Sequence, residues 1–268
     1  MQKYEKVGNR QRKVGVFSFV LRKMSNFARK RSDNKKMIEI TNLKKAFGET
    51  VACNIPSLRV ADSELLGLVG NNGAGKTTLF RLMLDLLKPD TGNVTIDGID
   101  PATSEQWKNI TAAFIDEGFL IDFLTPEEYF AFIGKVCGLP QATIDERLQP
   151  LEHFSGGEVL GQKKLIRDLS AGNKQKVGIM AALLQKPRLL VLDEPFNFLD
   201  PSSQVVLKHI LTEYARETGA TILLSSHNLQ HTVDISTRIV LLEKGIVHSD
   251  FTSIDELAKK QLSEYFGQ

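Results

Sequence analysis

The chain has 268 residues, of which 42% are hydrophobic and 25% are charged. This composition is typical of a globular protein and excludes a disordered, collagen-like or disulfide-stapled chain. Two cysteines, Cys53 and Cys137, lie far apart with no metal-binding spacing, which favours reduced thiols. No segment approaches the roughly 20 apolar residues that span a bilayer.

The first 36 residues differ from the rest in charge. They carry twelve lysines and arginines against two acids, a balance of +10, and the remainder carries −8. Apolar residues recur there at helical spacing, namely Val14, Phe17, Leu21, Met24 and Ala28. The pattern predicts an extension that is either an amphipathic helix on an anionic membrane or disordered. A targeting peptide, a nucleic-acid-binding arm and a translation start at Met37 are the remaining interpretations.

The folded part begins near Met37. Strands are predicted at 37–43, 55–60 and 64–70, and together they suggest a small sheet at the front of the domain. A glycine-rich turn at 70–77 follows, and then a helix from about Lys76 to Leu87 that ends before Pro89. The order of strand, glycine turn and helix is typical of a phosphate-binding site.

The rest of the chain alternates between strands and helices. A strand near 110–115 precedes a segment of helical periodicity at about 116–170, which we interpret as a helical insert. Helices are then predicted at 171–184, at 201–218 and from about 228, and strands at 188–192, 220–225 and 238–243. Short apolar strands separated by helices indicate a parallel sheet covered on both faces, a three-layer α/β architecture.

The turn at 70–77, GNNGAGKT, fits the pattern G-x-x-x-x-G-K-[ST] without a mismatch. Glycines let the backbone wrap around phosphates, and N–H groups at the start of the following helix point at them. Lys76 is expected to contact the β- and γ-phosphates, and Thr77 to ligate Mg²⁺. The predicted nucleotide-binding residues are Gly70, Asn71, Asn72, Gly73, Ala74, Gly75, Lys76, Thr77 and Thr78.

Two acids, Asp193 and Glu194, follow the apolar strand at 188–192. Ligands of parallel sheets bind at the carboxyl ends of the strands, so these carboxylates are expected beside the phosphates. Asp193 is suited to hold Mg²⁺, and Glu194 to polarise the attacking water. His227 ends another strand and is the candidate partner of the γ-phosphate or of that water. The alternative interpretation makes the acids solvated loop residues and His227 a helix-start residue.

Residues 169–184, LSAGNKQKVGIMAALL, decide the family. Leu169, Ser170 and Gly172 precede a helix that leads to the Asp193 strand, and they resemble the signature motif of ABC ATPases. The competing segment SGGE at 155–158 lies 38 residues before Asp193 and lacks a strong helix start, whereas Ser170 lies 23 before it. From Met37 onward the chain resembles an ABC transporter ATP-binding subunit. The resemblance implies a P-loop NTPase core with an antiparallel β subdomain and an inserted helical subdomain.

The resemblance also implies roles for single residues. Phe47 stands where the family stacks an aromatic ring on adenine, and Asp200 matches an acid that communicates between two nucleotide sites. Ser170 and Gly172 are expected to contact the γ-phosphate of ATP bound to the opposite subunit. The resemblance therefore implies that two copies close head to tail over two ATP molecules with Mg²⁺, and that ATP hydrolysis opens them.

The sequence departs from the family pattern at several positions. Asp116 stands where a glutamine normally touches Mg²⁺ and the membrane partner, and as a carboxylate it remains a candidate Mg²⁺ ligand. Ala171 and Asn173 replace a glycine and a glutamine of the signature. Phe196 and Phe198 replace smaller residues, and either extend the dimer seam or pack locally.

The resemblance implies an ATP hydrolase on the inner face of the cell membrane that drives a separate transmembrane permease. Residues 123–140 resemble export-type subunits, and only 41 residues follow His227, which favours an exporter over importers with a large regulatory domain. A soluble ABC ATPase that acts on ribosomes or DNA is the second hypothesis, with nucleic acid as the less favoured partner. A weakly hydrolysing regulator, suggested by Asp116, is the third.

Overall fold

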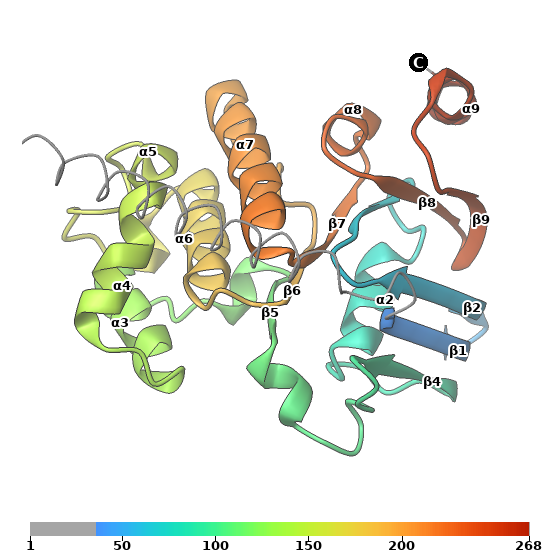
Figure 1. Cartoon of the computed structure of the whole chain (residues 1–268), viewed down its shortest axis with the longest axis horizontal. Helices are drawn as coiled ribbons and strands as arrows, with labels where there is room; N and C mark the ends of the chain where they lie inside the picture. Colours follow the sequence, from blue (N-terminus) through green and yellow to red (C-terminus); the bar gives the residue numbers. More distant parts are fainter. Residues whose placement is uncertain (1–35, 268) are drawn as a thin grey trace, which may run out of the picture. The chain divides into compact units, whose positions relative to one another are not determined.

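The computed structural model describes residues 36–267. The prediction for the basic extension, apart from Lys36, lies outside these residues. Two sheets and a group of helices make up the described part, with helices α3–α5 at one end and the smaller sheet at the other (Figure 1). This arrangement confirms the predicted α/β class with an antiparallel β subdomain and an inserted helical region.

The smaller sheet contains β1 (Lys36–Phe47), β2 (Thr50–Ala61) and β4 (Thr91–Ile96), in the order β2-β1-β4 and all antiparallel. The predicted sheet of three successive early strands is therefore wrong in its third member. The strand at 65–69 is buried at every position, so both of its faces need a covering layer, and it joins the larger sheet.

The larger sheet has six strands in the order β5-β6-β7-β3-β8-β9. The first five are parallel, and β9 pairs antiparallel with β8. Their bounds are β3 (Leu65–Val69), β5 (Thr111–Phe114), β6 (Leu189–Leu192), β7 (Thr221–Ser226), β8 (Arg238–Glu243) and β9 (Ile246–Phe251). The carboxyl ends of β3, β6 and β7 lie at one edge, which brings the residues after these strands together.

Five helices connect or follow these strands: α2 (Lys76–Met83), α6 (Ala171–Leu184), α7 (Pro201–Thr218), α8 (Leu229–Val233) and α9 (Glu256–Phe266). Helix α2 ends before the predicted Leu87, because Leu84 caps it and Asp85 has a left-handed φ of 53°. Helix α7 is bounded by Asp200 as N-cap, Pro201 in its first turn and Gly219 at its end.

The segment between β5 and α6 is mostly helical. It contains η2 (Glu117–Phe119), α3 (Pro126–Val136), α4 (Gln141–Leu148), η3 (Gln149–Leu151), α5 (Glu152–Ser155) and η4 (Ile166–Asp168), and a further short helix, η1 (Gln106–Asn109), precedes β5. Helix α3 starts with a capping box between Thr125 and Glu128 and has Pro126 in its first turn. These local signals explain why the helix begins where it does.

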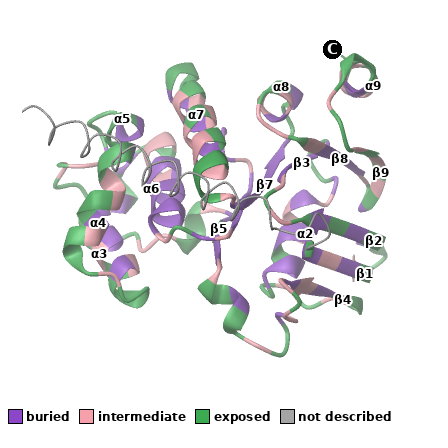
Figure 2. Ribbon diagram, in the orientation of Figure 1, coloured by how far each residue is buried: buried purple, intermediate pink, exposed green. Residues whose placement is uncertain are grey.

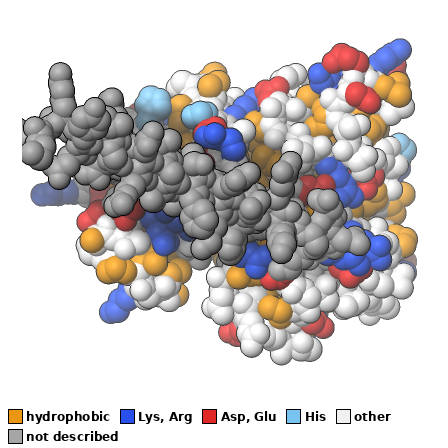
Figure 3. All heavy atoms as spheres, in the orientation of Figure 1, with side chains coloured by type: hydrophobic (Ala, Val, Ile, Leu, Met, Phe, Trp, Pro, Cys, Tyr) orange, Lys and Arg blue, Asp and Glu red, His pale blue; other side chains and the backbone are white. Residues whose placement is uncertain are grey.

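Two of the three hydrophobic clusters among the described residues contain most of the buried side chains. One lies between the two sheets around Phe80, Met83 and Ile38, and the other packs the helices around Phe130, Phe154 and Met180. Helix α6 is buried over most of its length, which Figure 2 shows in purple. On the part of the face drawn in colour in Figure 3, acidic, basic and apolar side chains are interspersed. Among the described residues, no helix is long and apolar enough to cross a membrane.

Candidate functional site

The glycine-rich turn between β3 and α2 fits tightly against its neighbours. A Cβ atom at Gly70 would lie 2.3 Å from the Leu242 carbonyl oxygen, and one at Gly75 would lie 2.4 Å from that of Ala52. Gly75 also has a left-handed φ of 103° directly before α2. A residue at position 75 must have no Cβ and must adopt a left-handed φ, and only glycine meets both demands. The glycine at this position of the sequence pattern is therefore required for steric reasons.

The side chain of Lys76 turns back into this loop. It is 6% exposed, and its Nζ donates hydrogen bonds to the carbonyl oxygens of Gly70 at 2.7 Å and Asn71 at 3.4 Å. The same Nζ lies 3.2 Å from Oε1 of Glu194. The ammonium group therefore stands at the mouth of the turn, with the start of α2 supplying further N–H donors.

Thr77 and Asp193 bring oxygen atoms together at the carboxyl end of β6. The Thr77 hydroxyl donates to Oδ2 of Asp193 at 2.5 Å, and the Ser225 hydroxyl donates to Oδ1. Asp193 is 6% exposed, and this burial raises its pKa against the opposing effect of the Ser225 and Thr77 hydrogen bonds. A buried carboxylate beside a hydroxyl is a ligand set that suits Mg²⁺.

Glu194 links the turn to β7. Its Oε2 lies 2.9 Å from Nδ1 of His227 and accepts the His227 backbone N–H at 3.2 Å, while Oε1 faces Lys76. Glu194 has a left-handed φ of 47°, an uncommon conformation outside glycine. Lys76, Thr77, Asp193, Glu194 and His227 thus form one network, which we call the catalytic network after the roles that the sequence predicts for Lys76, Glu194 and His227.

Two further residues, which were not predicted, hold this network. Ser225 accepts the backbone N–H of Glu194 at 2.8 Å while it donates to Asp193, and Gln175 donates from Nε2 to the Glu194 carbonyl at 3.1 Å. Ser225 lies on β7, two positions before His227. Its closeness in sequence to this predicted site residue is the signal that could have identified it. The sequence offers no local signal for the contact between Gln175 and Glu194.

The predicted signature residues lie outside the catalytic network. Ser170 is the N-cap of α6, where its hydroxyl accepts the Asn173 N–H at 3.2 Å, and its side chain is exposed. A Cβ at Gly172 would lie 2.6 Å from the carbonyl oxygen of Phe198, so this glycine permits close packing of the loop after Glu194. Phe198 has a φ of 62°, and its residue is 74% exposed. We call Ser170, Gly172 and Phe198 the signature edge.

Asp200 caps α7 through hydrogen bonds from the N–H groups of Ser202 and Ser203, each 3.0 Å long. The two serine hydroxyls also donate to its carboxylate, and these bonds hold the pKa of Asp200 below its ordinary value. In the single chain, the role of Asp200 is therefore that of a helix cap.

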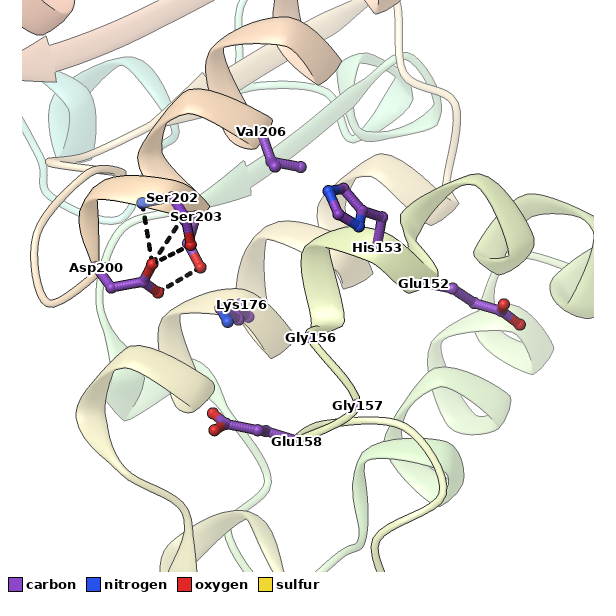
Figure 4. Close-up of a pocket in the computed structure, with 10 residues that line it drawn as sticks. All are labelled: Glu152, His153, Gly156, Gly157, Glu158, Lys176, Asp200, Ser202, Ser203 and Val206. Carbon is purple, nitrogen blue, oxygen red and sulfur yellow. Dashed lines mark hydrogen bonds between the residues drawn. The ribbon is translucent and has the colours of Figure 1, made fainter.

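A cavity of about 590 Å³ lies beside Asp200. Figure 4 shows Asp200, Ser202 and Ser203 on one side of it, and Lys176 of α6 and the Gly156–Glu158 loop also line it. Ser155 is the last residue of α5, and its hydroxyl donates to the Glu152 carbonyl at 2.8 Å. The segment SGGE therefore ends a helix, whereas Ser170 begins one.

Two predicted residues lie outside both groups. Phe47 ends β1 with its residue 53% exposed, and Lys45 Nζ lies 5.7 Å from the centre of its ring. The Asp116 carboxylate contacts Arg81 Nη2 at 3.0 Å and accepts the Gly118 N–H at 2.9 Å. Within residues 36–267 it makes no hydrogen bond to Thr77 or Asp193, so it does not join the oxygen atoms that were predicted to share a metal with it.

The chain matches a family model described as "ABC transporter" over residues 53–197. It is 34% identical over 238 residues to the bacitracin transport ATP-binding protein BcrA of Enterococcus faecalis, covering 84% of this chain and 71% of the relative. It is 33% identical over 218 residues to the methionine import ATP-binding protein MetN of Brucella abortus, covering 79% and 58%.

Solved structures agree with this result. The structure of an ATP-binding subunit of an ABC transporter is 29% identical, has a TM-score of 0.73, and is matched over 86% of this chain and 93% of its own. The dimeric ATP-binding cassette MJ0796, bound to ADP and Pi, is 23% identical with a TM-score of 0.71, over 80% and 97%. The second likeness supports the fold.

Proposed function

The chain belongs to the ABC transporter family as an ATP-binding subunit that hydrolyses ATP, and from this premise we propose that it powers export through a separate transmembrane permease. The observation that carries the proposed mechanism is the catalytic network, in which one carboxylate, Glu194, contacts both Lys76 and His227. The chain then acts as a peripheral subunit on the cytoplasmic face of the cell membrane.

In the proposed mechanism, the N–H groups of residues 70–78 and the Lys76 ammonium bind the β- and γ-phosphates. A phosphate competes with Oε1 of Glu194 for Lys76, because both are anionic partners of the same ammonium group. Glu194 then keeps its contact with His227 and turns the freed oxygen to the attacking water. The backbone N–H of His227 holds this carboxylate, and the single N–H of its imidazole donates either to Glu194 or toward the γ-phosphate.

Thr77 and Asp193 are the residues that would hold Mg²⁺. Their oxygen atoms lie 2.5 Å apart, and Asp193 is buried, with its second carboxylate oxygen bonded to the Ser225 hydroxyl. Bound Mg²⁺ would neutralise charge on the phosphate oxygens. Asp116 is directed to Arg81 and enters this site only if that contact breaks.

A second copy of the chain is proposed to supply what one copy lacks. The start of α6 presents oriented N–H donors and the exposed hydroxyl of Ser170, which suit an anion bound by another copy. ATP bound to one chain then also contacts the signature edge of the other chain, so that it bridges the two chains. Hydrolysis removes this bridge and opens the pair, because the closed state loses its differential stabilisation.

A smaller apolar cavity supports a docking position for the permease. Its volume is about 310 Å³, and its lining includes Leu86, Trp107 and Phe119. Leu86 and Phe119 are 49% and 52% exposed, and Phe119 follows the loop of Asp116. An apolar segment of the permease would cover these side chains and sense changes at Asp116.

Affinity purification from native membranes in mild detergent tests the partner. Recovery of a multi-span membrane protein whose presence changes ATP turnover supports the proposal, and recovery of ribosomes or DNA alone contradicts it. The export direction is favoured by the likeness of residues 123–140 to export-type subunits, while relatives include both a bacitracin transport protein and a methionine import protein.

Inverted membrane vesicles that contain the chain and its permease test the direction of transport. Bacitracin is the first probe, because the 34% identical relative is named for its transport. ATP-dependent accumulation inside the vesicles supports export, and a Glu194→Gln chain is the control. ATP-dependent loss of preloaded probe from the same vesicles indicates import instead.

A further inference from the structure

Gln175 connects α6 to the main chain of Glu194. Its residue is only 9% exposed, and its Nε2 donates to the Glu194 carbonyl at 3.1 Å. On the other side of the same residue, the Glu194 N–H donates to Ser225 on β7 at 2.8 Å. The backbone of Glu194 is therefore held between two elements that lie far from it in sequence.

This support matters because Glu194 is left-handed, with a φ of 47°. Such a conformation costs free energy for a residue with a Cβ, so neighbouring contacts must maintain it. The Asn197 N–H also reaches the Glu194 carbonyl at 3.1 Å, but Asn197 belongs to the same loop. Only Gln175 ties that carbonyl to a separate helix among the described residues.

The helix that carries Gln175 begins at Ser170. An α-helix rises about 1.5 Å per residue, so Gln175 lies roughly 7.5 Å along the axis from that start. Residues 175–184 of α6 are all buried, so close packing ties this part of the helix to its surroundings. A shift at its exposed start would reach Glu194 through the hydrogen bond of Gln175.

We propose that Gln175 is a positioning residue for Glu194. Through it, the helix whose start meets the ATP of the partner copy also sets the orientation of the carboxylate that acts on its own ATP. Gln175 itself touches neither nucleotide. The proposal rests on the proposed function, since it deepens the roles given there to Ser170 and Glu194.

Gln175→Met tests the proposal, because methionine keeps the length of the side chain and removes the donor. The Asn197 hydrogen bond still satisfies the Glu194 carbonyl, so the variant is expected to fold. Loss of one positioning hydrogen bond is expected to lower kcat about fivefold and to leave the Kd for ATP within about twofold. A slower hydrolysis step also accumulates the ATP-loaded dimer during turnover, which light scattering detects.

Gln175→Glu is the second variant. It places an acceptor against the carbonyl and is expected to lower kcat further than Gln175→Met does. Gln185→Met is the matched control, since Gln185 is the C-cap of the same helix and its amide likewise donates to a backbone carbonyl, that of Ala181 at 3.4 Å. The control is expected to keep the native kcat. All rates are expressed per nucleotide-binding site, and Tm is measured for each variant.

A lower Tm with an unchanged kcat in both Gln175 variants would mean a structural role only and would overturn the proposal. Equal loss of kcat in Gln185→Met would also overturn it. Glu194→Gln distinguishes a failure of the proposed function from a failure of the role given to Gln175. If Glu194→Gln retains native turnover, the proposed function is wrong, and the role of Gln175 is wrong with it. If it stops turnover while both Gln175 variants match the native protein, only the positioning role is wrong.

Discussion

The catalytic network and the signature edge differ in how far one chain completes them. In the network, Lys76 and Asp193 are each 6% exposed, and the Glu194 carboxylate has partners on both oxygens. At the signature edge, Ser170 and Phe198 are exposed, and the bonds of Ser170 serve its own helix start. The polar groups of the first region are paired within one chain, whereas the second region presents exposed residues at its surface.

Asp193 of the catalytic network and Asp200, which caps α7, differ in how their charges are stabilised. Burial raises the pKa of Asp193, so its charge is held at a cost that a bound cation would relieve. Hydrogen bonds from Ser202 and Ser203 lower the pKa of Asp200, so its charge is already stabilised by α7. The buried charge of Asp193 thus lowers the stability of the ligand-free protein and favours cation binding. The charge of Asp200 instead stabilises α7.

The largest expected effect is that of Glu194→Gln. Removal of the base is expected to lower ATP turnover by about a thousandfold. ATP binding is expected to persist, because Lys76 and the glycine-rich turn are unchanged, and an ATP-dependent dimer accumulates. Phosphate release and light scattering measure the two effects. Glu256→Gln, at an exposed position on α9, is the control, and a Glu194→Gln chain that stays monomeric at saturating ATP contradicts the account.

Ser170→Arg is expected to have the second largest effect. It distinguishes the contribution of the signature edge from that of the catalytic network. Loss of the signature donors is expected to lower turnover about a hundredfold, while a single chain binds ATP as before. Equilibrium binding at low protein concentration measures the affinity of the monomer. Ser253→Arg, at an exposed position near α9, is the control. Weakened binding to the monomer would show that Ser170 belongs to the site of its own chain.

Asp116→Gln is expected to have a smaller effect. The change removes an exposed negative charge near the phosphate site and the contact with Arg81, and turnover is expected to rise about twofold. Asp122→Asn removes a charge from the same exposed segment and is expected to leave turnover unchanged. A fall in the steady-state rate of Asp116→Gln would show instead that this carboxylate contributes to hydrolysis.

The smallest expected effect is the change in thermal stability that Asp193→Asn causes in the ligand-free protein. A carboxyl group whose pKa is raised by folding destabilises the native state at high pH, and this penalty shrinks once the pH falls below the raised pKa and is gone below the ordinary pKa. Without nucleotide and with EDTA at pH 7, the variant is expected to melt about 2 °C higher. The difference should shrink as the pH is lowered, and a lower Tm at pH 7 contradicts the cost assigned to Asp193.

Local patterns in the sequence were enough to predict most of the parallel sheet and the catalytic network. Continuous apolar runs such as 189–192 identify strands that are buried on both faces, and the acids that follow them must lie at the carboxyl edge. The missed strands β4 and β9 and the missed helix α9 lack this signal. β4 has only two buried residues, and β9 has none that is fully buried.

The parts of the site that were missed depend on contacts between distant elements. Gln175 reaches Glu194 across 19 positions, and Asp116 pairs with Arg81 across 35. Neither contact changes the local pattern of polar and apolar residues. The left-handed φ of Phe198 is equally hidden, since a bulky residue there runs against local preference and is set by packing against Gly172.

In the proposed dimer, the site that holds ATP in the glycine-rich turn of one chain is completed by the signature edge of a second chain. A mixture of two inactive variants, Lys76→Ala and Ser170→Arg, tests this pairing. In the mixed pair, one site combines an intact Lys76 from one chain with an intact Ser170 from the other. The mixture is expected to hydrolyse ATP clearly faster than the sum of the separate variants. A rate that stays at that sum would show that the two residues do not act on one ATP across two chains.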